Sequence, residues 1–504
     1  MENFDVIIVG AGLSGVGAAC HLRQRHPRKS FAILEGRNAM GGTWDLFRYP
    51  GVRSDSDMYT LGYRFRPWRA AQAIADAPAI LNYIRETAAE FKVDKEIRYG
   101  HRVTLASWST ADALWTVEAE TVLSSKQKPD RQGGLEKTPE KTRENTPQKI
   151  LARFTCNFLY LCTGYYDYEA GYTPDWPDVK RFRGQIVHPQ KWPEDLAYEG
   201  KRVVVIGSGA TAVTLVPAMS ERAAHVTMLQ RSPTYVVSRP AQDKLANGLR
   251  SVLPARAAYV LTRWKNVLLQ MVFYNLARSR PDLFKRMMAR GVRNHLGEQY
   301  DLKHFTPKYN PWDQRLCLVP DSDLFNAIRD GRATVVTDQI ETFTETGLQL
   351  KSGEHLDADI IVTATGLVLK LMSGLQLTVD GAPVDLSQTI TYKGMMYSDV
   401  PNLVSAFGYT NASWTLKCDL TAEYVCRLLK HMDQHGYAQC TPRVNDPDFT
   451  AEPAIDFTSG YVLRAIHTLP QQGSKTPWRV HQNYVKDLAM LRFGRVEDGT
   501  MEFN

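Results

Sequence analysis

The chain has 504 residues, of which 43% are hydrophobic and 10% aromatic, and this composition is typical of a globular enzyme with two or three domains. The formal net charge of +7 is modest for this length, and we find no RNA- or DNA-binding motif. We therefore expect no nucleic-acid partner.

The first predicted elements are a strand and a helix that flank a glycine-rich loop. Residues 4–9 form a short apolar run rich in β-branched residues, which predicts a buried parallel strand. Gly10, Gly12 and Gly15 follow in the Gly-x-Gly-x-x-Gly spacing. Gly10 suits the tight turn, Gly12 the approach of the backbone to a pyrophosphate, and Gly15 the close packing of helix on strand. The helix, expected over about 14–25, would point its positive end at the phosphates.

An acidic residue follows the next predicted strand. Residues 31–34 form this strand, and Glu35 comes directly after it, twenty residues beyond Gly15. A carboxylate at this distance is typical of ribose binding, and it would repel a 2′-phosphate. The first site is therefore predicted to bind FAD or NAD rather than NADP.

A second loop repeats this arrangement about two hundred residues later. The predicted strand 202–206 leads into Gly207 and Gly209, which Thr211 and Ala212 follow at the expected helix start. Two such loops imply two dinucleotides on one polypeptide, the arrangement that passes a hydride from a nicotinamide to a flavin.

The second site differs from the first at the end of its next strand. The predicted strand 225–230 ends in Arg231 and Ser232 instead of an acid. A guanidinium and a hydroxyl suit the extra 2′-phosphate of NADP, because the guanidinium can bind it with two hydrogen bonds. The alternative is that Arg231 is an ordinary solvated arginine. The pair of sites is interpreted as FAD first and NADPH second.

A polar tract over 121–149 separates two predicted strands, 113–118 and 154–161. It is longer and more charged than a turn requires, and we expect an exposed, mobile hairpin extension there.

Two Thr-Gly turns, ending at Gly164 and Gly366, each close a buried strand and predict where the chain leaves and re-enters the first domain. The expected fold is α/β, with two Rossmann-like dinucleotide-binding domains and a helical insertion. We predict a discontinuous FAD-binding domain at 1–165 and 367–504, and an NADP-binding domain at 166–366. A helical subdomain is expected over about 240–300.

The predicted helical subdomain is both apolar and basic. From Arg256 to Arg293 there are nine Lys or Arg residues and a single acid, Asp282. We favour a subdomain that packs on the active site and keeps its arginines solvated. The alternative is a peripheral contact with an anionic membrane surface.

The seven cysteines include no Cys-x-x-Cys pair, which predicts free thiols, a cytoplasmic location and no disulfide-reductase chemistry. The sequence starts directly in a strand, so we expect no targeting peptide. No apolar stretch reaches eighteen residues, so we expect no membrane span. We expect no metal site among the twelve histidines.

The segment between the two glycine loops contains a sequence motif found in a known enzyme family. Phe182, Gly184, His188 and Trp192, followed by Pro193, match the signature of Baeyer–Villiger monooxygenases at every fixed position. The related N- and S-oxidising flavin monooxygenases usually have Phe or Tyr where Trp192 and Pro193 stand. The chain thus resembles class B flavin monooxygenases of the type I Baeyer–Villiger group.

A second Baeyer–Villiger signature also fits: Gly41, Gly42 and Trp44, then 49–51, then Asp55. The resemblance extends over nearly the whole chain. The stretches that resemble the ethionamide-activating branch are 307–317, 408–417 and 477–484.

The resemblance implies an enzyme that uses NADPH, FAD and dioxygen to convert a ketone into an ester or lactone through a flavin peroxide. Sulfoxidation of thioethers would be a side activity. Arg315 resembles the family's catalytic arginine, whose permanent charge would stabilise a negative oxygen without giving up a proton. Asp55 resembles the aspartate that would hold this arginine.

The resemblance also places Gly42, Thr43 and Trp44 along the FAD, and Trp414 and Lys417 near the flavin. His188 either couples NADP binding to domain position through hydrogen bonds or is a packed histidine. Two other functions stay open: a flavin N/S-monooxygenase without Baeyer–Villiger activity, and an NADPH oxidase or nucleotide-binding sensor. The sequence predicts neither the natural substrate nor the oligomeric state.

Overall fold

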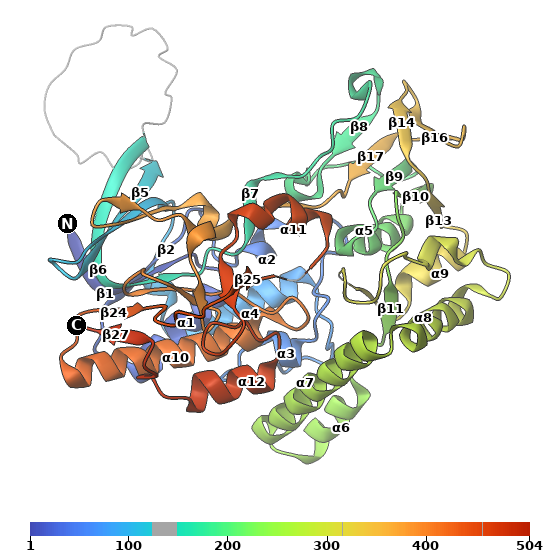
Figure 1. The fold of residues 1–504 in the computed structure, drawn as a ribbon. Coiled ribbons are helices and arrows are strands. Elements are labelled where there is room, and N and C mark those ends of the chain that lie inside the picture. Colours follow the sequence, from blue (N-terminus) through green and yellow to red (C-terminus); the bar gives the residue numbers. More distant parts are fainter. Residues whose placement is uncertain (123–148, 315, 456) are drawn as a thin grey trace, which may run out of the picture.

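The computed structural model describes residues 1–122, 149–314, 316–455 and 457–504 (Figure 1). Most of the predicted hairpin extension at 121–149, as well as Arg315, lies outside the described residues.

A nine-stranded sheet combines the N-terminal part of the chain with a later segment at 376–405. Its strands are β1 (Glu2–Val9), β2 (Phe31–Leu34), β3 (Ile97–Arg98), β4 (Arg102–Ser109), β5 (Leu114–Val122), β6 (Lys149–Leu161), β19 (Gln376–Val379), β20 (Ala382–Pro383) and β23 (Leu403–Ser405). The order is β20-β19-β4-β5-β6-β1-β2-β3, with β23 beside β6. β1 pairs in parallel with both β2 and β6, as expected for the first predicted unit.

Both faces of β1 are covered. Val6 and Ile8 face a core built with the helices α1 (Leu13–Arg25), α4 (Ala77–Glu90) and α10 (Trp414–His435). Ile7 and Val9 face a second core, which β4 and β5 complete. This double burial explains why the strand is a continuous apolar run and not an alternating one.

A five-stranded parallel sheet holds the second glycine loop. Its strands are β8 (Gln185–Val187), β9 (Arg202–Ile206), β10 (His225–Gln230), β13 (Ala333–Thr337) and β17 (Ile360–Thr363), in the order β13-β10-β9-β17-β8. Helices α5 (Ala210–Ser220) and α9 (Asp323–Arg329) pack beside it. The predicted α/β class is confirmed, and the predicted strands 31–34, 202–206 and 225–230 match the observed bounds.

The chain crosses between the two sheets on a narrow ribbon. β7 (Tyr166–Gly171) and β18 (Leu367–Leu369) pair antiparallel, one on the outgoing and one on the returning segment (Figure 1). Both crossings therefore lie side by side.

The segment expected to be helical over 240–300 consists of α6 (Lys244–Val252), α7 (Ala255–Ser279) and α8 (Pro281–Leu296). These helices do not share one core. Tyr259 and Val267 of α7 belong to the core of α1 and α10, whereas Val292 of α8 belongs to the core of the five-stranded sheet. Within the described chain, no helix is both long enough and apolar enough to cross a membrane.

A buried arginine fastens α7 to the nine-stranded sheet's helices. Arg263 Nη1 donates to the carbonyls of Tyr59 and Gly62, each at 2.8 Å, and Nη2 lies 3.4 Å from Asp419 Oδ2 on α10. Arg263 and Asp419 are each 4% exposed. Since these groups are shielded from water, each needs its partners.

We expect Arg263→Met to lower the free energy of unfolding by about 3 kcal/mol, because it leaves the Asp419 carboxylate buried with fewer partners. Chemical denaturation followed by tryptophan fluorescence measures the change. Arg256→Met, at an exposed position of the same helix, is the control and should shift stability by less than about 0.5 kcal/mol. Equal effects of the two substitutions would contradict an anchoring role for Arg263.

Candidate active site

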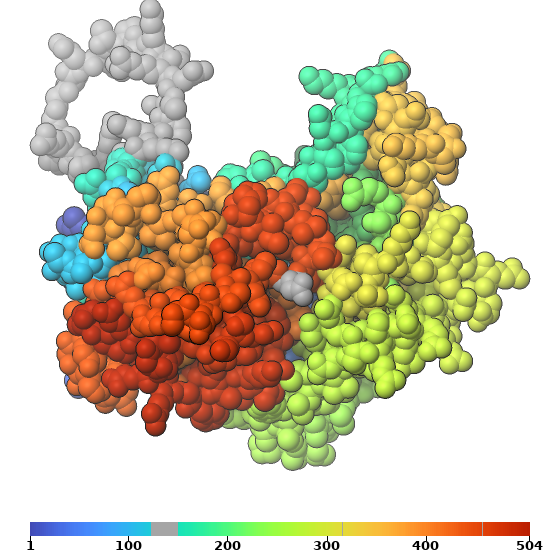
Figure 2. Space-filling view, viewed as in Figure 1, coloured from blue at the N-terminus to red at the C-terminus, as the bar shows by residue number. Residues whose placement is uncertain are grey.

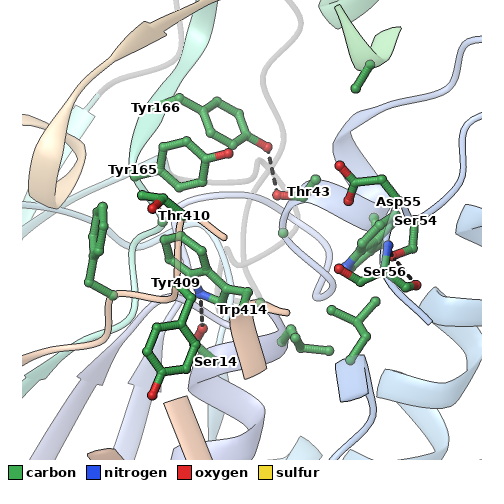
Figure 3. Close-up of a pocket in the computed structure, with 18 of the residues that line it drawn as sticks. Ser14, Thr43, Ser54, Asp55, Ser56, Tyr165, Tyr166, Tyr409, Thr410 and Trp414 are labelled. Atoms are coloured by element: carbon green, nitrogen blue, oxygen red, sulfur yellow. Dashed lines mark hydrogen bonds between the residues drawn. The ribbon is translucent and has the colours of Figure 1, made fainter. Parts of the chain in front are cut away.

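A cavity of about 290 Å³, here called the first cavity, opens at the first glycine loop (Figure 3). Its walls come from distant parts of the chain: the loop itself, residues 41–44, residues 53–56, the 164–168 segment and the start of α10. The predicted residues that line it are Gly12, Gly42, Thr43, Trp44 and Asp55.

The glycines of the first loop are required by space. A Cβ on Gly10, whose φ is +105°, would lie 2.5 Å from the Cys162 carbonyl oxygen, and a Cβ on Gly15 would lie 1.8 Å from the Gly10 oxygen. α1 begins after Gly12 with no side-chain cap. Its first N–H groups are thus available to an anion, as a pyrophosphate site requires.

Glu35 does not line the first cavity but braces its loop. Its carboxylate accepts hydrogen bonds from the Ala11 N–H at 2.8 Å and the Arg37 N–H at 2.9 Å. Burial raises the pKa of Glu35, and the two N–H donors oppose this shift. The predicted contact with ribose remains a prediction.

Residues 42–44 meet the crossing ribbon. The Thr43 and Tyr166 hydroxyls lie 2.7 Å apart, and a Cβ on Gly42 would come within 3.2 Å of the Tyr168 hydroxyl. Burial raises the pKa of Tyr166 well above its usual value, so this phenol stays neutral. No local pattern in the sequence points to Tyr166, because β7 reaches the loop only in the folded chain.

Aromatic side chains close the far side of the first cavity. Trp414 Nε1 donates to Ser14 Oγ at 3.1 Å, and its ring stacks on Tyr165 with centroids 5.0 Å apart (Figure 3). Trp414 thus lines the first cavity, and its place near the flavin remains a prediction. Lys417 does not line this cavity, because its Nζ is 2.9 Å from the buried carboxylate of Asp487.

Asp55 stands across the first cavity from Tyr165 (Figure 3). Its neighbour Arg53 also lines the cavity and pairs with Asp323 of α9 at 2.5 Å. This ion pair links the two sheets beside the cavity. Arg315, the expected partner of Asp55, lies outside the described residues, so their pairing remains a prediction.

A cavity of about 570 Å³, the second cavity, opens at the second glycine loop. The predicted residues Gly207, Gly209, Thr211, Arg231 and Ser232 all line it, whereas Ala212 is fully buried beneath the loop. α5 starts at this loop with no side-chain cap, so this cavity too offers free N–H groups to phosphates.

Three residues line both the first and the second cavity: Tyr165, Ala210 and Tyr461. The two cavities therefore adjoin. Sequence reasoning missed Arg464, which lines the second cavity and lies 3.5 Å above the ring centroid of Tyr172. It belongs to the C-terminal part of the chain, where no nucleotide motif points to it.

The signature residues line neither cavity. Phe182 is 8% exposed in a core of the five-stranded sheet, Gly184 packs on the Asp359 carbonyl, and Trp192 is half-buried. The His188 ring packs so closely on Gly171 of β7 that a Cβ there would lie 1.9 Å from Cε1.

His188 is set into the crossing ribbon as an uncharged group. Its Nδ1 accepts a hydrogen bond from the Gln190 N–H at 3.2 Å, and burial lowers its pKa. This placement is compatible with both roles considered for it, packing and coupling.

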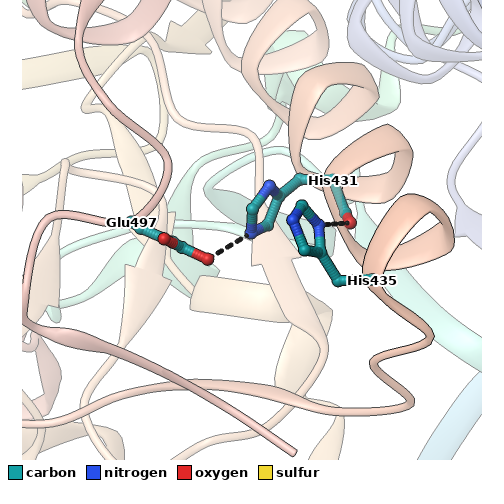
Figure 4. A group of neighbouring side chains, drawn as sticks. All are labelled: His431, His435 and Glu497. Atoms are coloured by element: carbon teal, nitrogen blue, oxygen red, sulfur yellow. Dashed lines mark hydrogen bonds and ion pairs between the residues drawn. The ribbon is translucent and has the colours of Figure 1, made fainter.

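Among the described residues, one group of side chains has the composition of a metal site: His431, His435 and Glu497 (Figure 4). His431 Nε2 lies 2.9 Å from Glu497 Oε1, and His435 Nδ1 lies 2.9 Å from the His431 carbonyl. Sequence reasoning expected no metal site among the histidines and missed this group, because Glu497 joins the two histidines only through folding. None of the three lines either cavity.

Comparison with known proteins places this geometry in a family. The model of the flavin-binding monooxygenase-like family matches residues 78–373, and that of an NAD(P)-binding Rossmann-like domain matches residues 8–74. The chain belongs to the flavin-binding monooxygenase-like family.

Its relatives match over the full length. The FAD-containing monooxygenase EthA of Mycobacterium tuberculosis (strain ATCC 25618 / H37Rv) is 52% identical over 504 residues, covering 100% of this chain and 98% of the relative. The probable FAD-binding monooxygenase AlmA of Acinetobacter baylyi is 47% identical over 505 residues, covering 100% and 96%.

Solved structures share the fold at low identity. A cyclohexanone monooxygenase with bound ε-caprolactone aligns at a TM-score of 0.75 and 17% identity, over 100% of both chains. A steroid monooxygenase bound to NADP aligns at 0.70 and 23% identity, over 88% of both chains.

The two glycine loops provide a matched pair of substitutions. Gly15→Ala should destabilise the protein by about 2 kcal/mol and reduce its flavin content, because the new methyl group collides with the Gly10 carbonyl. Gly209→Ala is the control, since a Cβ there has nothing within 4 Å and φ is −80°. Thermal unfolding and the flavin absorbance of the purified proteins measure both effects; similar stability losses would show that the loops are not packed as described.

Proposed function

We propose that this FAD-containing monooxygenase uses NADPH and dioxygen to convert ketones into esters or lactones, with sulfoxidation of thioethers as a side activity. The observation that carries the proposal is the pair of adjoining cavities, each opening at a glycine loop. One serves a flavin and the other a nicotinamide, and hydride transfer needs the two to meet.

The residues present fit the two cofactors. FAD would lie along Gly12, Gly42, Thr43 and Trp44, where the uncapped start of α1 meets its pyrophosphate. We propose a FAD-binding domain at 1–165 and 367–504.

NADP would bind at Gly207, Gly209 and Thr211, with Arg231 and Ser232 on its 2′-phosphate. The proposed NADP-binding domain is 166–366. Its helices α6 and α7 pack on the FAD-binding domain, although they lie within 166–366 in the sequence.

Reduced FAD supplies the activation of dioxygen when it is bound. The balanced reaction is ketone + O₂ + NADPH + H⁺ → ester + H₂O + NADP⁺. Arg315, which stays protonated, would stabilise the negative charge that develops on the substrate's carbonyl oxygen. Asp55, on the wall of the first cavity, would orient this guanidinium.

We propose ketones as the substrate class because the chain has the signature residues Trp192 and Pro193 together with Asp55 and Arg315. The second candidate is a flavin N/S-monooxygenase that lacks Baeyer–Villiger activity. It is compatible with the names of the relatives, because these names specify a monooxygenase but not its substrate.

The deciding experiment incubates the holoenzyme with NADPH, an aliphatic ketone and ¹⁸O₂. We expect one labelled oxygen in the ester by mass spectrometry; sulfoxide from a thioether with no ester from any ketone would establish the second candidate.

Arg315→Ala should leave the anaerobic reduction of the flavin by NADPH within about twofold, and lower ester formation at least about 1,000-fold, since the fixed positive charge is lost where negative charge develops. Stopped-flow absorbance and product analysis separate the two steps. Arg315→Lys keeps the charge and should recover part of the activity. Slow flavin reduction in Arg315→Ala would contradict this prediction, because it would place Arg315 in the reduction step.

Arg231→Ala should raise the KM for NADPH about 10- to 100-fold and leave that for NADH nearly unchanged, because a charge-assisted hydrogen bond to the 2′-phosphate is removed. Steady-state kinetics with both nucleotides provide the test. Arg222→Ala, an exposed arginine that pairs with Glu199 and lines neither cavity, is the control. Equal increases in the KM values for NADH and NADPH would show that Arg231 does not recognise the 2′-phosphate.

A further inference from the structure

One side of α7 is apolar and open to solvent. Leu261, Trp264, Leu268 and Val272 follow one another at helical spacing and are 38% to 62% exposed. The opposite side of the helix, with Tyr259 and Val267, is buried in the core. The helix is therefore already packed against the core through one face, and its apolar side chains on the other face are not needed for that packing.

The adjoining helix α8 has an exposed face of its own that is both apolar and basic, and the two helices belong to the yellow-green part of the surface in Figure 2. On α8, Leu283, Arg286, Met287 and Arg290 lie three or four residues apart, so they share one face, and all four are exposed. No acidic partner for Arg286 or Arg290 is found among the described residues. Three other cations of α7 and α8 do have acidic partners: Lys265 pairs with Asp243, Arg278 with Asp313, and Lys285 with Asp282.

A third, smaller cavity connects this surface with the first cavity. This side cavity, of about 120 Å³, is lined by Phe273 of α7, Phe284 and Met288 of α8, and Trp312. It shares five lining residues with the first cavity, Asp55 among them. Phe273 is also 37% exposed, so that one ring belongs both to the outer surface and to the cavity wall.

We propose that the apolar and basic side of α7 and α8 docks on an anionic lipid bilayer, with the side cavity opening toward the lipid at Phe273. Exposed apolar side chains beside unpaired arginines complement acyl chains and anionic headgroups. A second copy of this chain would meet the same arginines and would be repelled unless it brought acids, which are scarce on this face. Together with the proposed function, docking lets an apolar ketone pass from the bilayer to the first cavity without crossing water.

Docking is tested by co-sedimentation of the holoenzyme with vesicles of phosphatidylcholine and phosphatidylglycerol, and with vesicles of phosphatidylcholine alone. We expect binding to the anionic vesicles that falls at least tenfold in Arg286→Glu/Arg290→Glu. The control, Lys201→Glu/Lys351→Glu, makes the same charge change at exposed sites outside α7 and α8 and should bind as the wild type does. Trp264→Ser/Leu268→Ser should also weaken binding, with unchanged thermal unfolding.

Three outcomes would overturn the docking proposal. One is the absence of binding to anionic vesicles, and another is equal loss in the control variant. The third is a dimer in light scattering that Trp264→Ser/Leu268→Ser converts to a monomer, which would assign the surface to a second copy of the chain.

The entry route is tested with a bilayer-dissolved and a water-soluble ketone. Arg286→Glu/Arg290→Glu should raise the apparent KM for the bilayer-dissolved ketone at least fivefold and leave that for the water-soluble ketone unchanged. Equal effects on both would overturn the route. If neither ketone is converted while vesicle binding persists, the proposed function fails and the docking surface stands.

Discussion

The structure depends on one spatial constraint: two nucleotide loops on two separate sheets must open onto a shared space. Hydride transfer occurs only between atoms in contact, so neither loop is sufficient alone. The two cavities meet this constraint by sharing Tyr165, Ala210 and Tyr461. The Arg53–Asp323 ion pair at 2.5 Å joins the sheets beside the shared wall, and the paired strands β7 and β18 carry the chain across next to it.

The features that could be predicted from the sequence are those that short stretches of the chain determine, such as the glycine loops. Gly15 is required by the Gly10 carbonyl oxygen within a single strand–turn–helix unit, and Gly10 by the positive φ of the turn itself, so a spacing of a few residues records both requirements. The side chains that complete the cavities leave no such record. Trp414 reaches Ser14 across 400 residues, and Arg464 reaches the second cavity from the far end of the chain. Their places follow from tertiary packing, which no local pattern contains.

The signature between the loops lies outside both cavities, in the region where the two sheets are joined. Phe182 fills a core, and the His188 ring presses on Gly171 of the crossing ribbon. Burial lowers the pKa of His188, so that this contact carries no charge at neutral pH. These residues thus report how the two sheets are joined. None of their side chains lines either cavity, so any effect that they have on the cavities is exerted through this joint.

The helical insertion divides its attachments between the two sheets, and this division has a mechanical consequence. Arg263 ties α7 to α10 through Asp419 and to the carbonyls of Tyr59 and Gly62, whereas α8 contributes Val292 to the core of the five-stranded sheet. A rotation of one sheet against the other would therefore have to be accommodated in part where α7 ends and α8 begins, at Ser279 to Pro281. The side cavity is lined by residues of these same two helices and shares part of its wall with the first cavity. The covalent path of the chain thus ties the helices that line the side cavity to both of the sheets that hold the nucleotide loops.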